Sequence, residues 1–403
     1  TLNGEKTNKE FNDLINNYVL DKITCKNGTI ATYNKATNEV SLSNIHMPDY
    51  CTMNFRYTIY GKLLADNTTI KTRTDFSSVF TETNTGTLYK STESIAGNTP
   101  KEVYYFAGNA KNNWVKFAGY YWRIIRTNHD GSARLLYSGT SPDTTEGYIG
   151  TSAFNKEFNS PKYVGYMYGD SDVDLDKART NTNNSTIKTY IDNWYSNNLS
   201  AYTKYLSKDA VYCNDRNEVT AGTFNTGSTK FYYAPSDRLD KNKTPTYNCT
   251  NKKDAFSGSN SEAKLTYPVG LMTADELAYA GGKVGAALSS PYAWYYLNSA
   301  GASITGKEWW WLFSPHFWNA YNADSFIVVG SSDPGNLNGS GVLNGSGVRP
   351  VISLKGNLVW KSGDGSSASP YEVEDLPPTL SETIKSYATS HTNGVYNENG
   401  YRY

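Results

Sequence analysis

The sequence predicts an α+β protein in which a small disulfide-linked β-domain precedes a large mixed domain. Three observations lead to this prediction. Short strand-like segments separated by turn residues dominate the chain, and a few helical patterns with clear start signals interrupt them. The four cysteines fall into two well-separated pairs, Cys25 with Cys51 and Cys213 with Cys249. At about 100–200 residues per domain, a chain of 403 residues has room for two to four domains.

The composition limits the possible partners. Lys and Arg number 38 and Asp and Glu number 38, so the net charge is zero and a nucleic-acid partner is not expected. The chain contains 34 Tyr and 9 Trp, which is typical of a folded protein rather than a disordered one. We expect no membrane span, because no run of about 18 apolar residues occurs.

The first hundred residues predict a helix, a β-domain and a linker. A capping box, Thr7-x-x-Glu10, precedes apolar residues at helical spacing and predicts a helix over 7–20. Residues 22–57 predict short strands broken by turns, which places the first domain at 1–57. Residues 58–100 hold a short helix-like stretch and a Thr/Ser/Asn-rich segment, which predicts an extended linker.

The cysteines predict two disulfides, Cys25–Cys51 and Cys213–Cys249, each stabilising the fold by about 3–4 kcal/mol. The alternative is four buried free thiols in a cytosolic protein. A low-charge chain rich in Tyr, Thr, Asn and Ser favours the exported, disulfide-bonded form. No cysteine lies in a Cys-x-x-Cys pair and the four histidines are far apart, so we expect no metal site and no cofactor.

Residues 101–374 predict one large domain, followed by a tail over 375–403. Ser185 is a plausible N-cap for a helix over 185–199, and a second capping box, Thr273-x-x-Glu276, predicts a helix that Gly281 ends. A polar excursion over 200–262 lies between the two helices. The predicted strands are 103–106, 114–117, 120–125, 133–137, 309–313, 325–329, 348–354 and 358–360, with a turn at Asp130-Gly131.

Four segments of the large domain carry a family resemblance. They are WVKFAGYYWRIIR (114–126), GSARLLYSG (131–139), VGLMTADELAYAGG (269–282) and GVRPVISL (347–354). Together they resemble Gram-positive bacterial cell-surface repeat proteins with a C-type-lectin-like domain. Formylglycine-generating enzymes and the variable proteins of diversity-generating retroelements resemble this domain in fold. The resemblance implies that the Gly-x-Arg-Pro strand closes the core, with Arg349 in a structural role, and that the preceding stretch presents ligand-facing side chains.

The sequence departs from the enzymes that share this fold. Formylglycine-generating enzymes use a late pair of cysteines, whereas the last cysteine here, Cys249, comes well before Arg349. The histidine cluster of related iron-dependent enzymes and the calcium-lectin motifs are also missing. Asp192, Asp215, Asp275 and Glu276 show no spacing that would pair them across a substrate, and Asp215-Arg216 predicts a local ion pair.

Residues 309–346 are the candidate recognition surface, because large aromatic residues stand next to small polar residues there. The competing interpretation places Trp309, Trp311 and Phe313 in the core, with Trp310 pointing the other way because strand side chains alternate. The tandem LNGSGV repeat at 337–348 predicts a pair of tight turns. The ligand-binding candidates are Trp310, His316, Phe317, Trp318, Asn319, Tyr321, Asn322 and Asp324.

We therefore expect a non-enzymatic extracellular surface or appendage protein that recognises a glycan or protein ligand. The alternative is the subunit of an extracellular filament, joined head-to-tail by its terminal segments. A weak echo between 58–106 and the tail suggests this self-association, with Tyr396, Tyr401 and Tyr403 at the chain end. An enzyme of the formylglycine-generating type is disfavoured by the cysteine positions.

Overall fold

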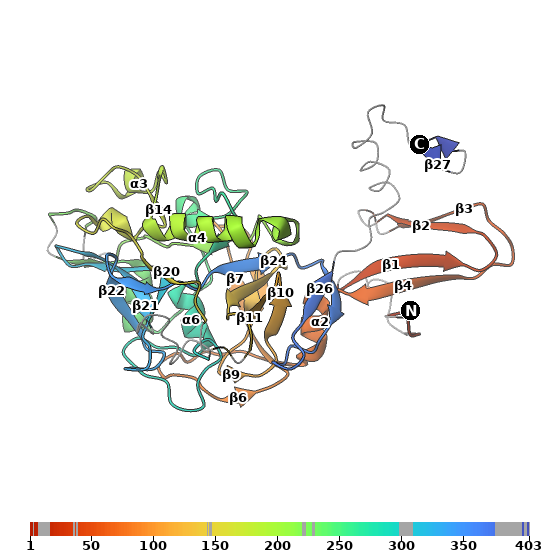
Figure 1. Ribbon diagram of the computed structural model, residues 1–403, viewed down its shortest axis with the longest axis horizontal. Coiled ribbons are helices and arrows are strands. Elements are labelled where there is room, and N and C mark those ends of the chain that lie inside the picture. The colour runs from red at the N-terminus through yellow and green to blue at the C-terminus, as the bar shows by residue number, and fades with distance from the viewer. Residues whose placement is uncertain are drawn as a thin grey trace. The chain divides into compact units, whose positions relative to one another are not determined.

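The chain divides into two compact units in the computed structural model (Figure 1). Unit 1 contains residues 1–58 and 374–403, and unit 2 contains residues 59–373. The structure describes residues 1–2, 4–6, 17–34, 37, 39–142, 144, 147–219, 223–227, 230–297, 309–374, 397–398 and 401–402.

Unit 1 is built on a long antiparallel ribbon of β1 (Tyr18–Cys25) and β4 (Cys51–Tyr57). Cys25 and Cys51 lie directly opposite each other in this register and form a disulfide, as predicted. Tyr18 and Phe55 are the buried centre of a small apolar cluster on the ribbon. The remaining strands of unit 1 form two hairpins, β2 (Ile30–Asn34) with β3 (Glu39–Ser43), and β27 (Asn397–Glu398) with β28 (Tyr401–Arg402).

The predicted helix over 7–20 is wrong at its C-terminal end, because Tyr18 begins β1. Tyr18 fits the helical spacing, but it also alternates with Leu20, and pairing with β4 buries Tyr18 and partly buries Leu20 in the apolar cluster of the ribbon. Residues 7–16 lie outside the described residues, as do the tail residues 375–396 that the predicted echo includes.

Unit 2 contains two mixed sheets (Figure 1). The eight-stranded sheet has the order β19-β24-β12-β11-β8-β7-β5, with β10 also paired to β11. The six-stranded sheet has the order β13-β23-β20-β21-β22, with β17 also paired to β20. The bounds in the first sheet are β5 (Thr69–Lys71), β7 (Thr87–Glu93), β8 (Lys101–Tyr105), β10 (Trp114–Phe117), β11 (Tyr120–Thr127), β12 (Ala133–Tyr137), β19 (Val269–Gly270) and β24 (Val351–Leu354). Those in the second are β13 (Thr151–Ala153), β17 (Phe231–Tyr232), β20 (Trp310–Trp318), β21 (Ala323–Val328), β22 (Leu337–Gly341) and β23 (Gly345–Gly347).

The helix-like stretch predicted at the start of residues 58–100 is confirmed as α2 (Ile59–Asp66). The extended linker predicted for this segment is wrong, because β5 and β7 extend the eight-stranded sheet. Ile59, Leu63 and Leu88 are fully buried in the main core. The Thr/Ser/Asn-rich composition suggested solvated chain, but a few apolar side chains at buried positions are enough to anchor these elements to the core.

The two predicted helices of unit 2 are confirmed. Helix α4 (Thr186–Asn198) has Ser185 as its N-cap, and it packs against β13 of one sheet and β19 of the other. Helix α6 (Ala274–Ala280) has the capping box of Thr273 and Glu276 and ends at Gly281. Short helices complete the unit: α3 (Leu175–Ala178), α5 (Ala234–Ser236), η1 (Pro161–Val164), η2 (Ser200–Tyr205), η3 (Asp237–Asn242) and η4 (Lys252–Asp254).

Four two-stranded pairs connect the remaining segments. They are β6 (Thr83–Asn84) with β9 (Asn109–Ala110), β14 (Met167–Tyr168) with β15 (Asn183–Asn184), β16 (Tyr212–Cys213) with β18 (Ala255–Phe256), and β25 (Val359–Ser362) with β26 (Glu372–Glu374). The second predicted disulfide, Cys213–Cys249, is present beside β16. None of the described helices has the length and apolar character needed to cross a membrane.

Candidate functional site

A row of four residues crosses the six-stranded sheet on one face. Tyr232 of β17 lies opposite Phe317 of β20, Phe317 lies opposite Asp324 of β21, and Asp324 lies opposite Gly341 of β22. Residues directly opposite one another in antiparallel strands project to the same face of the sheet. We call these four residues the cross-strand row. It places two aromatic rings, a carboxylate and a residue without a side chain next to one another.

A lysine, Lys230, lies beside the two aromatic rings of the cross-strand row. The rings of Tyr232 and Phe317 lie 5.8 Å apart between centroids. Lys230 Nζ lies 4.8 Å from each centroid. An ammonium at this distance is attracted to the negative face of an aromatic ring. Phe317 therefore belongs to a cationic, aromatic surface rather than to the core.

Asp324 is the carboxylate of the cross-strand row. The residue is 8% exposed, and among the described residues its carboxylate forms no hydrogen bond or ion pair. Burial raises the pKa of Asp324 to about 6, although the positive charge of Lys230 opposes this shift. A largely buried carboxylate without donors is energetically unfavourable. A Cβ at residue 341 would lie 3.7 Å from Asp324 Oδ1, in contact with the carboxylate. Because Gly341 has no Cβ, that position beside Asp324 stays open.

His316 is a neutral residue that packs against aromatic rings next to the cross-strand row. Its ring centroid lies 4.6 Å from that of Phe317 and 4.4 Å from that of Phe326. Burial, with a contribution from Lys230, lowers the pKa of His316 to about 3. Its Nδ1 is buried without a hydrogen-bond partner and packs on the backbone of Gly339. The register of β20 against β21 is irregular around Pro315, the residue before His316.

A tight turn at the end of β20 presents Tyr321 to solvent. Asn319 Oδ1 accepts hydrogen bonds from the backbone N–H of Tyr321 at 2.9 Å and of Asn322 at 2.7 Å. Ala320 adopts φ 79°, the left-handed region that the turn requires. Asn319 and Asn322 therefore shape the turn, while the Tyr321 side chain is 78% exposed.

Two of the predicted ligand-binding residues lie in the core. Trp310 is 0% and Trp318 is 1% exposed, whereas Trp309 is 41% exposed. The expectation that Trp309 packs inside and Trp310 outside is therefore wrong. Alternation fails as a guide here because the first six residues of β20 are buried on both faces, as in a central strand of a sheet with two buried faces.

The LNGSGV repeat forms strands rather than the predicted pair of tight turns. The first copy supplies β22 and the second supplies β23. Glycine at 339 and 341 gives β22 a surface without side chains, which faces His316 and Asp324. Sequence reasoning also missed Lys230 and Tyr232. No local signal marks them, because β17 joins the site only through its long-range pairing with β20.

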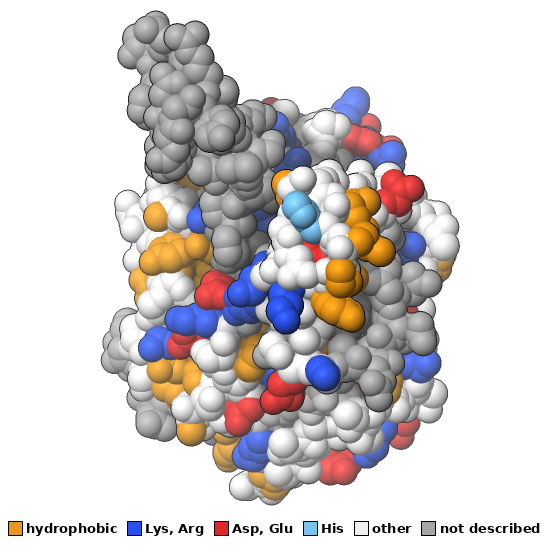
Figure 2. Space-filling view, turned by 90° about the vertical axis from the view of Figure 1, so that its right-hand side faces the viewer, with side chains coloured by type: hydrophobic (Ala, Val, Ile, Leu, Met, Phe, Trp, Pro, Cys, Tyr) orange, Lys and Arg blue, Asp and Glu red, His pale blue; other side chains and the backbone are white. Residues whose placement is uncertain are grey.

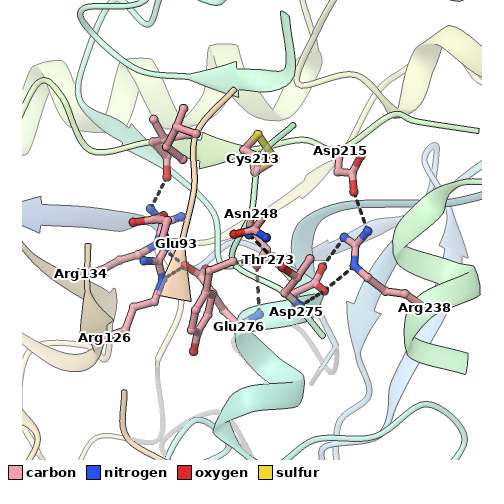
Figure 3. A pocket seen from close by; sticks show the side chains of 15 residues that line it. Glu93, Arg126, Arg134, Cys213, Asp215, Arg238, Asn248, Thr273, Asp275 and Glu276 are labelled. Atoms are coloured by element: carbon pink, nitrogen blue, oxygen red, sulfur yellow. Dashed lines mark hydrogen bonds and ion pairs between the residues drawn. A yellow bond between two sulfur atoms is a disulfide. The ribbon is translucent and has the colours of Figure 1, made fainter. Parts of the chain in front are cut away.

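A second group of charged side chains lies inside unit 2, and Figure 3 shows its arginines and carboxylates turned toward one another. Arg126 Nη2 lies 2.9 Å from Glu93 and Arg126 Nε lies 2.8 Å from Glu276. Arg134 Nε lies 2.6 Å from Glu276. We call these four residues the ionic cluster. They line a cavity of about 20 Å³, which holds about one water molecule.

The carboxylates of the ionic cluster are engaged by arginines. Burial alone would raise the pKa of Glu93, but the charge of Arg126 and hydrogen bonds from His129 and Arg126 outweigh it and lower the pKa to about 2. The hydrogen bond to Glu93 in turn raises the pKa of His129. Paired groups of this kind anchor a fold, and their removal leaves an uncompensated buried charge.

The predicted Asp215–Arg216 ion pair is wrong. Arg216 is buried and its Nε lies 2.6 Å from Asp254. Asp215 instead pairs at 2.7 Å with Arg238, which also holds Asp275 through two hydrogen bonds. These pairs connect the polar excursion over 200–262 to helix α6, so that segment is part of the folded unit.

Arg349 is fully buried, a placement that fits its expected structural role. Its guanidinium donates to the backbone carbonyls of Tyr137 and Tyr295 and lies 4.8 Å from the Trp310 ring. Burial lowers the pKa of Arg349 to about 10. The residue thus joins the end of β12 to the segment before β24.

A family model described as a domain of unknown function, DUF6273, matches residues 171–356, which include the whole cross-strand row. No curated protein matches the chain. No solved structure matches it either.

Proposed function

We propose that this chain is a non-enzymatic, extracellular recognition protein that binds a polyhydroxylated ligand, such as a surface glycan, at the cross-strand row. The observation that carries the proposal is Asp324, a largely buried carboxylate without a hydrogen-bond donor among the described residues. Ligand hydroxyl groups would supply the missing donors. The resemblance to C-type-lectin-like domains, and the mixed sheets of unit 2, support a lectin-like fold for this purpose.

The surroundings of Asp324 suit a sugar ring. Phe317 and Tyr232 offer aromatic faces, which pack well against the apolar face of a sugar. The exposed Tyr321 lies on the turn that joins β20 to β21, three residues before Asp324, and adds a third aromatic ring. Lys230 adds donors for hydroxyl oxygens. Rigid aromatics beside adaptable polar groups are typical of recognition surfaces.

Two further observations support a non-enzymatic function and an extracellular location. The carboxylates of the ionic cluster are held by arginines, so they are poorly placed for acid–base chemistry. Both disulfides are typical of proteins from oxidising compartments, which supports an extracellular, bacterial-surface location.

Glycan-array screening followed by calorimetric titration of the best glycan tests the proposal. Replacing Tyr321 with Ala, or Asp324 with Asn, should weaken binding by about tenfold or more, as expected for residues at the centre of an interface. Tyr50→Ala is the matched control, because Tyr50 is 75% exposed but belongs to unit 1. Affinity should also rise as the pH increases through about 6, because ionised Asp324 accepts hydrogen bonds through both of its oxygens.

The proposal is wrong if no glycan binds, or if Tyr50→Ala weakens binding as much as Tyr321→Ala. Trp318→Ala is unsuitable as a binding variant, because it would remove a core side chain. A second candidate function is that of a filament subunit joined head-to-tail by its terminal strands. The exposed apolar side chains of unit 1 favour self-association, although β27 and β28 pair with each other.

A further inference from the structure

Unit 1 exposes a concentration of large apolar side chains. Hydrophobic side chains, coloured orange, reach the molecular surface in Figure 2. Soluble proteins seldom leave such groups together in water unless they mark an interaction site. The exposed residues between positions 30 and 50 are Ile30, Val40, Leu42, Ile45, Met47 and Tyr50.

Strand β3 is an open edge within this surface. Among the described residues it pairs only with β2, and all five of its residues are exposed. Its sequence, EVSLS, alternates polar and apolar residues, which is typical of a strand with one buried face. The register with β2 puts Val40 opposite Tyr33 and Leu42 opposite Ala31, so one face of the hairpin is apolar.

The edge carries little protection against pairing. Natural edge strands usually carry Lys, Pro or an inward-pointing charge that discourages a further strand. The only charge in β3 is Glu39, at its first position, and the strand contains no proline. An isolated two-stranded hairpin is also only marginally stable, and more strands would stabilise it.

Hydrogen bonds and a disulfide hold the segment that follows β3 in place. Asp49 Oδ1 accepts hydrogen bonds from Asn27 N–H at 2.8 Å and Tyr50 N–H at 2.7 Å, and its Oδ2 accepts one from Thr29 N–H at 2.9 Å. The Cys25–Cys51 disulfide closes the base of the same loop. Such pre-organisation lowers the entropy cost of association.

We propose that β3 pairs antiparallel with β3 of a second copy of this chain, about a two-fold axis at Ser41. In this register Ser41 faces the partner's Ser41, Val40 faces the partner's Leu42, and Glu39 faces the partner's Ser43. Each apolar side chain meets another and no like charges meet. The pairing extends the two hairpins into one four-stranded sheet with a continuous apolar face.

The self-complementary pattern identifies the occupant as a second copy. A two-fold interface requires that each contact occurs twice with its members exchanged. Val40 and Leu42, placed symmetrically about Ser41, meet this requirement without any change of sequence. The interface closes on itself, so it forms a dimer and is distinct from head-to-tail assembly of the termini.

Cysteine cross-linking of the full chain tests the register. In a directly opposite antiparallel pair the Cα atoms lie about 4.5–5.5 Å apart, a separation that a disulfide spans. Ser41→Cys should therefore give a covalent dimer on a non-reducing gel under mild oxidation. Thr32→Cys is the matched control, because Thr32 lies opposite Ser41 on β2. Its distance from the partner's Thr32 would be about three strand spacings, or roughly 14 Å, so it should not cross-link.

Charge variants and light scattering provide the second measurement. The mass of the unmodified chain should rise toward that of a dimer with concentration. Ser41→Lys and Ser41→Glu should each keep the chain monomeric, because like charges then face each other, and an equimolar mixture should restore the dimer. Monomers at all concentrations, or cross-linking of Ser41→Cys no faster than that of Thr32→Cys, would overturn the proposal. A binding partner that captures only monomers through β3 would overturn it as well.

Discussion

The carboxylate of Asp324 lowers the stability of the fold that holds it. Its pKa is raised from 3.8 to about 6 by burial, so the folded state binds the Asp324 proton more tightly than the unfolded state does. His316 lies on the same surface, yet it adapts to burial by staying neutral, because its pKa is lowered to about 3. Asp324, in contrast, is ionised at neutral pH, so its buried charge destabilises the folded state. Retaining an unpaired charge is easier to explain by ligand binding than by stability.

We predict that Asp324→Asn stabilises the protein at pH 8. A raised carboxyl pKa means that stability falls as the pH rises from about 4 to about 6, and that the full cost is present above that window. The shift of about two pKa units corresponds to at most on the order of 3 kcal/mol. Urea unfolding should therefore show a gain for the variant at pH 8 that shrinks toward pH 4. A loss of stability at pH 8 would show that Asp324 has a stabilising partner.

At the scale of elements, local signals predicted α4 and α6. Features that depend on pairing between distant strands could be predicted only in part. Ser185 and the Thr273–Glu276 capping box identified α4 and α6 because caps are determined by residues within one turn. The cross-strand row could be predicted only in part. Phe317 and Asp324 were found from composition, whereas Tyr232 joins the row through a strand more than 80 residues away, and no pattern within β17 marks it.

Strand β22 offers a matched pair of glycines for an element-scale prediction. A Cβ at residue 339 would lie 1.8 Å from His316 Nδ1, whereas a Cβ at residue 341 would make only ordinary contacts at 3.7 Å. Gly339→Ala should therefore displace His316 and destabilise unit 2 by about 1–3 kcal/mol, the usual cost of overpacking. Gly341→Ala should leave stability nearly unchanged but weaken ligand binding beside Asp324. Thermal unfolding and glycan titration of both variants check this, and equal melting temperatures would contradict it.

At the scale of the whole molecule, the two units rely on different sources of stability. Unit 2 has a large apolar core and buried ion pairs, whereas the described part of unit 1 buries only a few side chains around Tyr18 and Phe55. A small domain of this kind usually needs a covalent bridge. The Cys25–Cys51 disulfide should therefore matter much more to unit 1 than to unit 2.

Tryptophan fluorescence can separate these contributions, because all nine tryptophans lie between residues 114 and 360, within unit 2. We predict that replacing Cys25 and Cys51 with Ser leaves the fluorescence-detected melting temperature unchanged. The same variant should lose hydrogen-exchange protection in β1 and β4, since a bridge closing a loop of this length contributes about 3–4 kcal/mol. Replacing Cys213 and Cys249 is the matched control. That bridge lies in unit 2 beside β16, so its loss should lower the fluorescence-detected melting temperature and leave β1 and β4 protected. If both double variants lower the tryptophan signal equally, the units do not unfold independently and the division of stability between them is wrong.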